Sequence, residues 1–318
     1  MTQTQGWHQE WGSIQAGDGG GAGALSALAP VPAAAMAALE QAVWAADAAS
    51  DHGVLAAAAT ACAAVLGLPA RIPAGAGDPG AGDPTSLAFA EQFSIDVSST
   101  TDEQRAGLVE ALGVGTGPFV QGLYVVDFFP RARAALDALF GPPAADRSAH
   151  NTTAPPAAGS GPAQDLWGLS MEFLRSVALL GELDPLTAEL VRLRGASQHQ
   201  CRLCKSLRNR TAIEAGGNDD LFAAVDADRA PLSDAQRAAL ALADAMIWTP
   251  GGLDPEVVEA VRRHFSPSAA VALVLWVTRN ASNKIAVALA ADAAHVTDGI
   301  EIYDLDARGE PVYGLTPA

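Results

Sequence analysis

Apolar residues recur at three- and four-residue steps through the second half of the chain, as in the series Leu166, Leu169, Phe173, Val177 and Leu180. This spacing places side chains on one face of an α-helix. We therefore expect consecutive helices over about 165–181, 185–197, 200–215, 218–228, 233–248, 254–264 and 267–292. The last of these is apolar on every side around 271–277, so we expect it to be buried.

Capping residues support these boundaries. Three side chains that accept hydrogen bonds from a first helical turn each stand before a proline, which is well suited to that turn: Asp184-Pro185, Asp254-Pro255 and Ser266-Pro267. Ser233 and Gln236 are spaced for a capping box. Gly216-Gly217 is a typical helix stop.

The first half of the chain resembles a degenerate copy of the second. Three pairs of segments correspond at a shift of about 152 to 153 residues: 90–93 with 243–246, 101–112 with 253–264, and 119–136 with 271–289. Segments rich in glycine and proline separate the blocks. We predict a disordered tail at 1–30, a degenerate helical repeat at 31–140, a linker at 141–163, a second helical domain at 164–297 and a C-terminal tail at 298–318.

Composition favours an all-α protein. Of the 318 residues, 49% are hydrophobic and 6% are aromatic, and much of the apolar content is alanine, the best helix former. The net charge of −17 argues against nucleic acid as a partner. We find no signal peptide and no apolar run near the ~18 residues that span a membrane. We therefore expect a cytoplasmic protein without a membrane partner.

The chain has three cysteines, Cys62, Cys201 and Cys204. An odd number with one close pair is typical of a reactive pair or a metal site in a cytosolic protein. Cys201 and Cys204 form a CxxC motif, which places both sulfurs on one helical face at a spacing compatible with a disulfide. If the pair opens a helix near Gln200, the free N–H groups there favour a thiolate. We interpret Cys62, surrounded by alanines, as a small buried hydrophobe.

A basic segment surrounds the pair, although the chain as a whole is acidic. Six of the nineteen Lys and Arg residues lie within nineteen positions: Arg192, Arg194, Arg202, Lys205, Arg208 and Arg210. Basic neighbours lower a thiol pKa, and we expect two or three of them near the sulfurs. Three interpretations of the pair stay open, namely a redox pair, a structural or vestigial pair, and a metal site. The metal site would lack a second motif to complete four zinc ligands.

The chain resembles the carboxymuconolactone decarboxylase superfamily, in its AhpD-like alkylhydroperoxidase branch. Glu189, Cys201 and Cys204 stand at the spacing of that family, within the segment that opens ELVRLRGAS. The likeness continues through AIEAGG (212–217), LSDAQRAALALADAM (232–246) and VLWVTRNASNKIAVAL (274–289), and covers about 165–295 well. It implies an all-α, AhpD-like helical bundle, here with two pseudo-repeat halves, which assembles as a homo-oligomer.

The resemblance also implies roles for the residues of the site. Cys204 would attack a peroxide, Cys201 would resolve the sulfenic acid as a disulfide, and Glu189 would belong to a proton relay. The cofactor would be this redox-active disulfide alone, with no metal, and an external thiol would reduce it. The family has a histidine four residues after the second cysteine, where this chain has Arg208. Arg208 can stabilise a thiolate but cannot shuttle protons, so thiol–disulfide exchange is easier to support than peroxidase turnover.

His199, two residues before Cys201, is a second candidate for the relay. Two further functions stay open beside a peroxidase or disulfide oxidoreductase. One is a decarboxylase of lactones, which uses the same fold without needing CxxC. The other is a non-catalytic helical assembly module in which the pair is vestigial.

Overall fold

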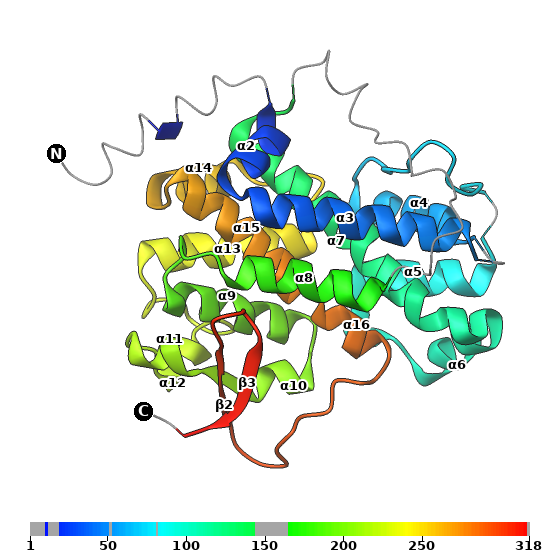
Figure 1. The fold of residues 1–318 in the computed structure, drawn as a ribbon. Coiled ribbons are helices and arrows are strands. Elements are labelled where there is room, and N and C mark those ends of the chain that lie inside the picture. Colours follow the sequence, from blue (N-terminus) through cyan, green and yellow to red (C-terminus); the bar gives the residue numbers. More distant parts are fainter. Residues whose placement is uncertain (1–9, 12–18, 51–52, 81, 144–164, 317–318) are drawn as a thin grey trace.

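The computed structural model describes residues 10–11, 19–50, 53–80, 82–143 and 165–316. Most of them are helical, which confirms the all-α expectation apart from one small sheet (Figure 1). In the first half the helices are α2 (Gly20–Leu28), α3 (Pro30–Ala48), α4 (Leu55–Leu66), α5 (Pro84–Asp96), α6 (Asp102–Leu112) and α7 (Thr116–Phe140), with short 3-10 turns η1 (Val97–Ser99) and η2 (Gly113–Gly115).

The second half contains more and shorter elements. Its helices are α8 (Leu166–Ala178), α9 (Pro185–Gln198), α10 (Arg202–Lys205), α11 (Arg210–Glu214), α12 (Asp219–Ala223), α13 (Asp234–Trp248), α14 (Pro255–His264), α15 (Pro267–Asn280) and α16 (Asn283–Ala288). The strands are β1 (Leu207–Asn209), β2 (Glu301–Leu305) and β3 (Pro311–Leu315). The sheet order is β1-β2-β3, with β1 parallel and β3 antiparallel to β2.

The predicted helix starts are confirmed at the caps. The carboxylates of Asp184 and Asp254 accept backbone N–H bonds from the first turns of α9 and α14, and Ser266 does so for α15. Ser233 and Gln236 form the reciprocal capping box of α13. These local hydrogen bonds satisfy N–H groups that a helix leaves free at its first turn.

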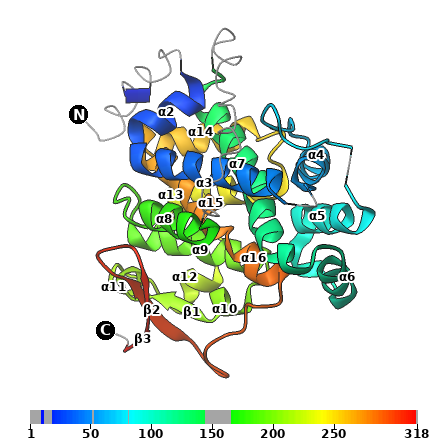
Figure 2. The ribbon, with the colours of Figure 1, turned by 45° about the vertical axis from the view of Figure 1, so that its right-hand side comes forward.

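α7 and α15 form the centre of the molecule. α15 is buried on nearly its whole surface, as its apolar sequence predicts, and it packs on α7, α8 and α9. α7 packs in turn on α2, α3 and α4. One hydrophobic cluster runs through both halves, and Figure 2 shows the helices of the first half lying against those of the second. The two sequence halves therefore share one core.

Two predicted long helices are broken. The expected helix 200–215 divides into α10, β1 and α11, because residues 207–209 leave the helical path to pair with β2. The expected helix 267–292 ends at Asn280 and resumes as α16 after a turn at 281–282. The expected helix 218–228 is confined to Asp219–Ala223.

Parts of both predicted tails are folded. Trp11 stacks on Phe140 and donates its indole N–H to the carbonyl of Phe265, and α2 begins at Gly20. The predicted C-terminal tail contains the β2–β3 hairpin. Of the predicted linker 141–163, all but 141–143 lies outside the described residues.

Among the described helices, none is by itself long and apolar enough to cross a membrane. α2 and α3 meet that test only when taken together, and the chain bends by 117° between them.

Candidate functional site

The cysteine pair lies at a sharp turn between α9 and α10. Gln200 has φ = 52°, in the left-handed region, and this reverses the chain after α9. Cys201 then takes the N-cap position of α10, and its sulfur accepts the backbone N–H of Cys204 at 3.2 Å. The two cysteines form a disulfide with their Cα atoms 5.3 Å apart. The pair therefore opens a helix, as predicted, although that helix is a single turn.

The two cysteines differ in exposure. Cys201 is 1% exposed and belongs to the hydrophobic core, whereas Cys204 is partly exposed and packs at the edge of that core. A reagent from solvent can reach Cys204 more easily than Cys201.

Glu189 is buried in α9, and four hydrogen bonds hold its carboxylate. Arg192 binds it through Nε and Nη2, both at 2.6 Å. The backbone N–H of Asn209 (3.1 Å) and the hydroxyl of Tyr303 (3.3 Å) complete the set. Within the described part of the chain, no hydrogen bond joins Glu189 to either sulfur.

Arg192 connects this carboxylate to the CxxC segment. Its Nη1 donates to the carbonyl of Cys204 at 2.7 Å, and its Nη2 donates to the carbonyl of Leu207 at 2.8 Å. Burial acts to lower the pKa of Arg192, but the Glu189 carboxylate outweighs burial and holds that pKa above its ordinary value. The Glu189–Arg192 pair thus fixes the backbone on the C-terminal side of the CxxC helix.

The N-terminal side of that helix is held by Asp292, which the sequence analysis missed. Asp292 Oδ2 accepts the backbone N–H of Arg202 at 2.8 Å, and its carbonyl accepts the N–H of Leu203 at 2.9 Å. Its Oδ1 also pairs with the Arg202 guanidinium at 2.6 Å. Burial acts to raise the pKa of Asp292, but the hydrogen bonds from Arg202 outweigh it and lower that pKa.

Asp292 changes the electrostatics that the sequence predicts for the pair. The free N–H groups expected to favour a thiolate are in part already bound to a carboxylate. A negative side chain at this end of a helix also opposes a second negative charge there. The signal for Asp292 is absent from the local sequence, because it lies 90 residues after Arg202.

The basic segment is largely neutralised by acids from elsewhere in the chain. Arg194 pairs with Asp226 and Asp244, and Arg210 pairs with Asp304. Lys205 is exposed and donates to the side chain of Gln200.

Arg208 lies on β1, with its guanidinium 5.4 Å from the centre of the Phe222 ring. It donates to the carbonyls of Lys205 and Leu207. Burial, together with the nearby Arg192 charge, lowers the pKa of Arg208. Within the described residues, no hydrogen bond joins Arg208 to a cysteine sulfur.

The β2–β3 hairpin covers the same region. The N–H of Glu301 donates to the carbonyl of Ser206 at 2.8 Å, directly after α10. Tyr303 reaches Glu189 with its hydroxyl, and its ring lies 5.3 Å from the Arg192 guanidinium. Figure 1 shows the hairpin beside α10 and α11. Residues predicted to form a tail therefore complete the surroundings of the cysteine pair.

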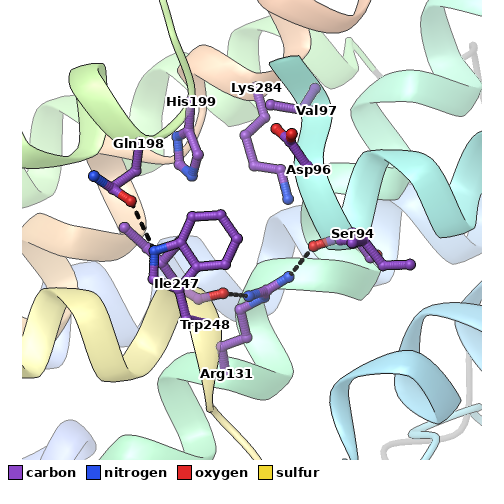
Figure 3. A pocket seen from close by; sticks show the side chains of 10 residues that line it. Ser94, Asp96, Val97, Arg131, Gln198, His199, Ile247, Trp248 and Lys284 are labelled. Carbon is purple, nitrogen blue, oxygen red and sulfur yellow. Dashed lines mark hydrogen bonds between the residues drawn. The ribbon is translucent and has the colours of Figure 1, made fainter. Parts of the chain in front are cut away.

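His199 faces a different part of the molecule. Its Nδ1 binds the side-chain oxygen of Asn283 at 2.7 Å, and its ring meets Phe128 edge to face. Burial, assisted by the charge of Lys284, lowers the pKa of His199 to about 3. His199 lines a pocket between α5, α7, α13 and α16 (Figure 3). Within the described residues, no hydrogen bond joins the His199 ring to Glu189 or to either cysteine sulfur.

Comparisons with known proteins give relatives of this chain. Two Mycobacterium tuberculosis proteins, "Uncharacterized protein MT2376" of strain CDC 1551 / Oshkosh and "Uncharacterized protein Rv2313c" of strain ATCC 25618 / H37Rv, are each 44% identical over 238 residues. The matched region covers 71% of this chain and 79% of each relative. The chain belongs to the family of these mycobacterial proteins. No family model and no solved structure matches it.

Cys62 lies apart from the pair, in the middle of α4. It is fully buried and its thiol contacts the carbonyl of Ala90 at 3.7 Å. Burial, together with the charge of Asp127, raises the pKa of Cys62 to about 12. A neutral buried thiol agrees with the interpretation of Cys62 as a small hydrophobe.

In the part of the chain that the structure describes, no group of three or more His, Cys, Asp or Glu side chains could hold a metal ion.

Proposed function

We propose that this protein is a thiol-based redox enzyme that works through Cys204 and Cys201. The observation that carries the proposal is the pair itself, bonded across one helical turn, with one partly exposed and one buried sulfur. A pair that already meets at bonding distance can cycle between dithiol and disulfide with little movement of the backbone.

The cycle starts from the reduced pair. With a peroxide, the Cys204 thiolate attacks one oxygen, the O–O bond breaks, and an alcohol leaves while Cys204 becomes a sulfenic acid. The Cys201 thiol then attacks Cys204, which releases water and forms the disulfide. With a disulfide substrate, the Cys204 thiolate attacks one sulfur, which forms a mixed disulfide and releases half of the substrate as a thiol; Cys201 then attacks Cys204, which closes the Cys201–Cys204 disulfide and releases the other half as a thiol. An external thiol supplies two electrons to restore the pair in either case.

Of these two reactions, thiol–disulfide exchange has more support. Arg208 replaces the histidine of the resembling family, and Glu189 is held by Arg192 rather than facing the sulfurs. Asp292 also acts against a strongly acidic thiol at the start of α10. Exchange needs a nucleophilic thiol but no dedicated proton relay, so these features limit it less than they limit peroxide reduction.

The finer fold assignment belongs to the same proposal. The order α5, α6, α7 in the first half corresponds to α13, α14, α15 in the second, in agreement with two pseudo-repeat halves of an AhpD-like bundle. The resemblance to the AhpD-like branch also favours a homo-oligomer, and we expect it to be located in the cytoplasm. A lactone decarboxylase of the same fold, or a non-catalytic module with a vestigial pair, would remain if the thiols proved inert.

The decisive experiment measures thiol reactivity in wild type, Cys201→Ser and Cys204→Ser. Each reduced protein is alkylated across a pH series, before and after treatment with peroxide or with an oxidised small dithiol, and analysed by peptide mass spectrometry. We expect a reversible Cys201–Cys204 disulfide and faster alkylation of Cys204 than of Cys201. Two thiols that stay reduced and titrate near ~8.5 would refute a redox function. Rapid disulfide exchange without peroxide consumption would identify an oxidoreductase rather than a peroxidase.

A further inference from the structure

Two guanidinium groups meet at the C-terminal end of the CxxC helix. Arg192 Nη2 and Arg208 Nη1 each donate to the carbonyl of Leu207 at 2.8 Å. Arg192 also binds the carbonyl of Cys204 at 2.7 Å. Arg208 binds the next carbonyl, that of Lys205, at 2.9 Å. Because a guanidinium stays protonated in proteins, two full positive charges lie directly after Cys204.

A single carboxylate is bonded to this pair of cations. Glu189 binds Arg192 through both of its oxygens, and its other two partners are neutral groups. Within the described residues, Arg208 forms no ion pair. Burial and then the Arg192 charge lower the pKa of Arg208, although Glu189 and Asp219 act in the opposite direction. One of the two guanidinium charges therefore has no carboxylate in contact with it.

Arg208 also has nitrogens without an acceptor. Its Nη1 makes both carbonyl bonds, and Nε and Nη2 have no hydrogen-bond partner among the described residues. Nε is sealed from solvent, whereas Nη2 is not. The Phe222 ring of α12 supports the guanidinium by a cation–π contact, and Figure 2 shows α10, β1 and α12 at the same end of the molecule. Nη2 is thus a held, charged donor that a carboxylate from solvent can reach.

Lys205 is a second cation without a counter-charge. It follows Cys204 directly and is exposed, and its Nζ donates to the neutral side chain of Gln200 at 2.7 Å. On the hairpin, the carboxylate of Glu301 is occupied by His295. The other basic side chains near the pair are bonded to acids, as described above for Arg192, Arg202 and Arg210.

Both charges act on a molecule that reacts at Cys204. α10 is a single turn of four residues, about 6 Å long, and Arg208 binds its last carbonyl. The Arg208 charge is therefore on the order of 10 Å from the sulfur of Cys204. This is comparable to the Debye length of about 10 Å at 0.1 M salt. The arm of a disulfide that extends from the reacting sulfur toward Arg208 shortens the distance further.

We propose that Arg208, assisted by Lys205, selects disulfide substrates that carry a carboxylate close to the S–S bond. The inference rests on the proposed exchange reaction at Cys204. The carboxylate binds Arg208 Nη2 and is not changed by the reaction. Arg208 is thus a specificity-determining residue at a position where the resembling family has a proton shuttle.

The exchange reaction itself is balanced within the substrate and the cysteine pair. The Cys204 thiolate attacks one substrate sulfur, the S–S bond breaks, and the first half leaves as a thiolate that takes a proton from water. Cys201 loses its proton to solvent and attacks Cys204, and the second half leaves in the same way. The substrate gains two electrons and the cysteine pair loses two.

The experiment compares three small disulfides of equal arm length and different charge. They are dithiodipropionate, which is anionic, cystamine, which is cationic, and hydroxyethyl disulfide, which is neutral. The reduced protein is mixed with each, and peptide mass spectrometry gives the rate at which the Cys201–Cys204 disulfide forms. Each rate is divided by that of a neutral thiol, N-acetylcysteinamide, with the same disulfide, which removes the intrinsic reactivity of the probe.

We expect the normalised rate to be highest for dithiodipropionate and lowest for cystamine. The ratio of these two rates does not depend on the thiol pKa, because both probes react with the same thiolate. Arg208→Gln should lower this ratio about 3- to 10-fold, since the lost charge acts with opposite sign on the two probes. Lys205→Gln should lower it about twofold, because solvent screens an exposed charge more. Raising the salt from about 0.01 M to 1 M should bring the wild-type ratio toward one.

Arg263→Gln is the matched control. It removes the same unit of charge from the exposed face of α14, which lies at the opposite end of the molecule from α10 (Figure 1). It should leave the ratio unchanged.

Equal normalised rates for the anionic and cationic probes in wild type would overturn the proposed selection. An equal decrease of the ratio in Arg208→Gln and Arg263→Gln would do the same. In either case, reaction of the neutral hydroxyethyl disulfide would leave the exchange function standing. If none of the three probes reacts, the exchange function fails and the selection fails with it. Lys205→Gln changes an exposed side chain, so this variant and the salt series decide the question even where Arg208→Gln does not fold.

Discussion

Replacing Asp292 by Asn tests the electrostatic description of the cysteine pair. Asn keeps the shape of the side chain and an oxygen that can accept the Arg202 backbone N–H, but it removes the negative charge from the start of α10. It also frees the Arg202 guanidinium from its 2.6 Å ion pair. Both changes make the surroundings of the pair more positive, so both should lower the thiol pKa of Cys204.

The expected size of this effect follows from the position of the charge. Two exposed charged side chains close together interact by about 0.2–1 kcal/mol. At 1.36 kcal/mol per pKa unit, loss of the Asp292 charge corresponds to a decrease of roughly 0.1–0.7 units in the pKa of Cys204. Arg202 is well exposed, so solvent screens most of its added contribution.

The assay is the pH dependence of alkylation of reduced Cys204, read by peptide mass spectrometry. Asp254→Asn is a control, because the Asp254 carboxylate also accepts a first-turn N–H, that of Glu256 in α14, but this helix carries no cysteine. We expect a lower thiol pKa in Asp292→Asn and no change in Asp254→Asn. An unchanged or raised pKa in Asp292→Asn, with the fold intact by circular dichroism, would refute this reasoning.

Three further predictions concern stability. Glu189→Gln leaves Arg192 buried without its counter-charge and should reduce the free energy of unfolding in urea by about 3 kcal/mol. Asp234→Asn is the control, because it breaks an exposed ion pair and should reduce that free energy by less than about 1 kcal/mol. Equal losses in the two variants would contradict the role of the buried pair. The pKa of His199 is lowered to about 3, whereas the unfolded chain has an ordinary histidine pKa of ~6.5. Below pH ~6.5 the unfolded chain therefore binds a proton at this residue that the folded chain does not. This difference makes the free energy of unfolding fall as the pH drops from ~6.5 toward 3. His199→Gln should therefore show a shallower decrease of Tm between pH 7 and 4 than wild type, and parallel curves would argue against a buried neutral imidazole. Tyr303→Phe removes one hydrogen bond to Glu189 and should lower the unfolding free energy by about 1 kcal/mol, whereas no change would show that the hairpin is not anchored there.

The features that sequence predicts well are local. Asp184, Ser233 and Ser266 mark helix starts because a cap and its N–H partner lie within three residues. The apolar run of α15 identifies a buried helix for a similar reason, since its side chains leave no polar face. The placement of the cysteine pair at the opening of a helix also follows from neighbouring residues.

The features that sequence misses depend on distant residues. Asp292 reaches Arg202 across 90 positions, and β2 leaves little sign in the sequence that it will pair with β1. His199 and Cys201 are separated by Gln200 in a left-handed conformation, which is uncommon for a residue with a side chain. The contacts that His199 makes are with Asn283 and Phe128, which also lie far from it in the sequence. The Asp127–Arg131–Lys284 group is likewise assembled from two halves and has no local motif.

The pairing of β1 with β2 has a consequence for how the protein is made. The ribosome synthesises Cys201 and Cys204 first, and β2 follows about 100 residues later. At about 5–20 residues per second, this interval lasts roughly 5–20 s. During it, the turn that carries the cysteines has neither Asp292 to hold its first N–H groups nor Tyr303 against Glu189. The nascent chain therefore passes through a period in which its thiols meet cellular oxidants without the shielding that the finished fold gives them.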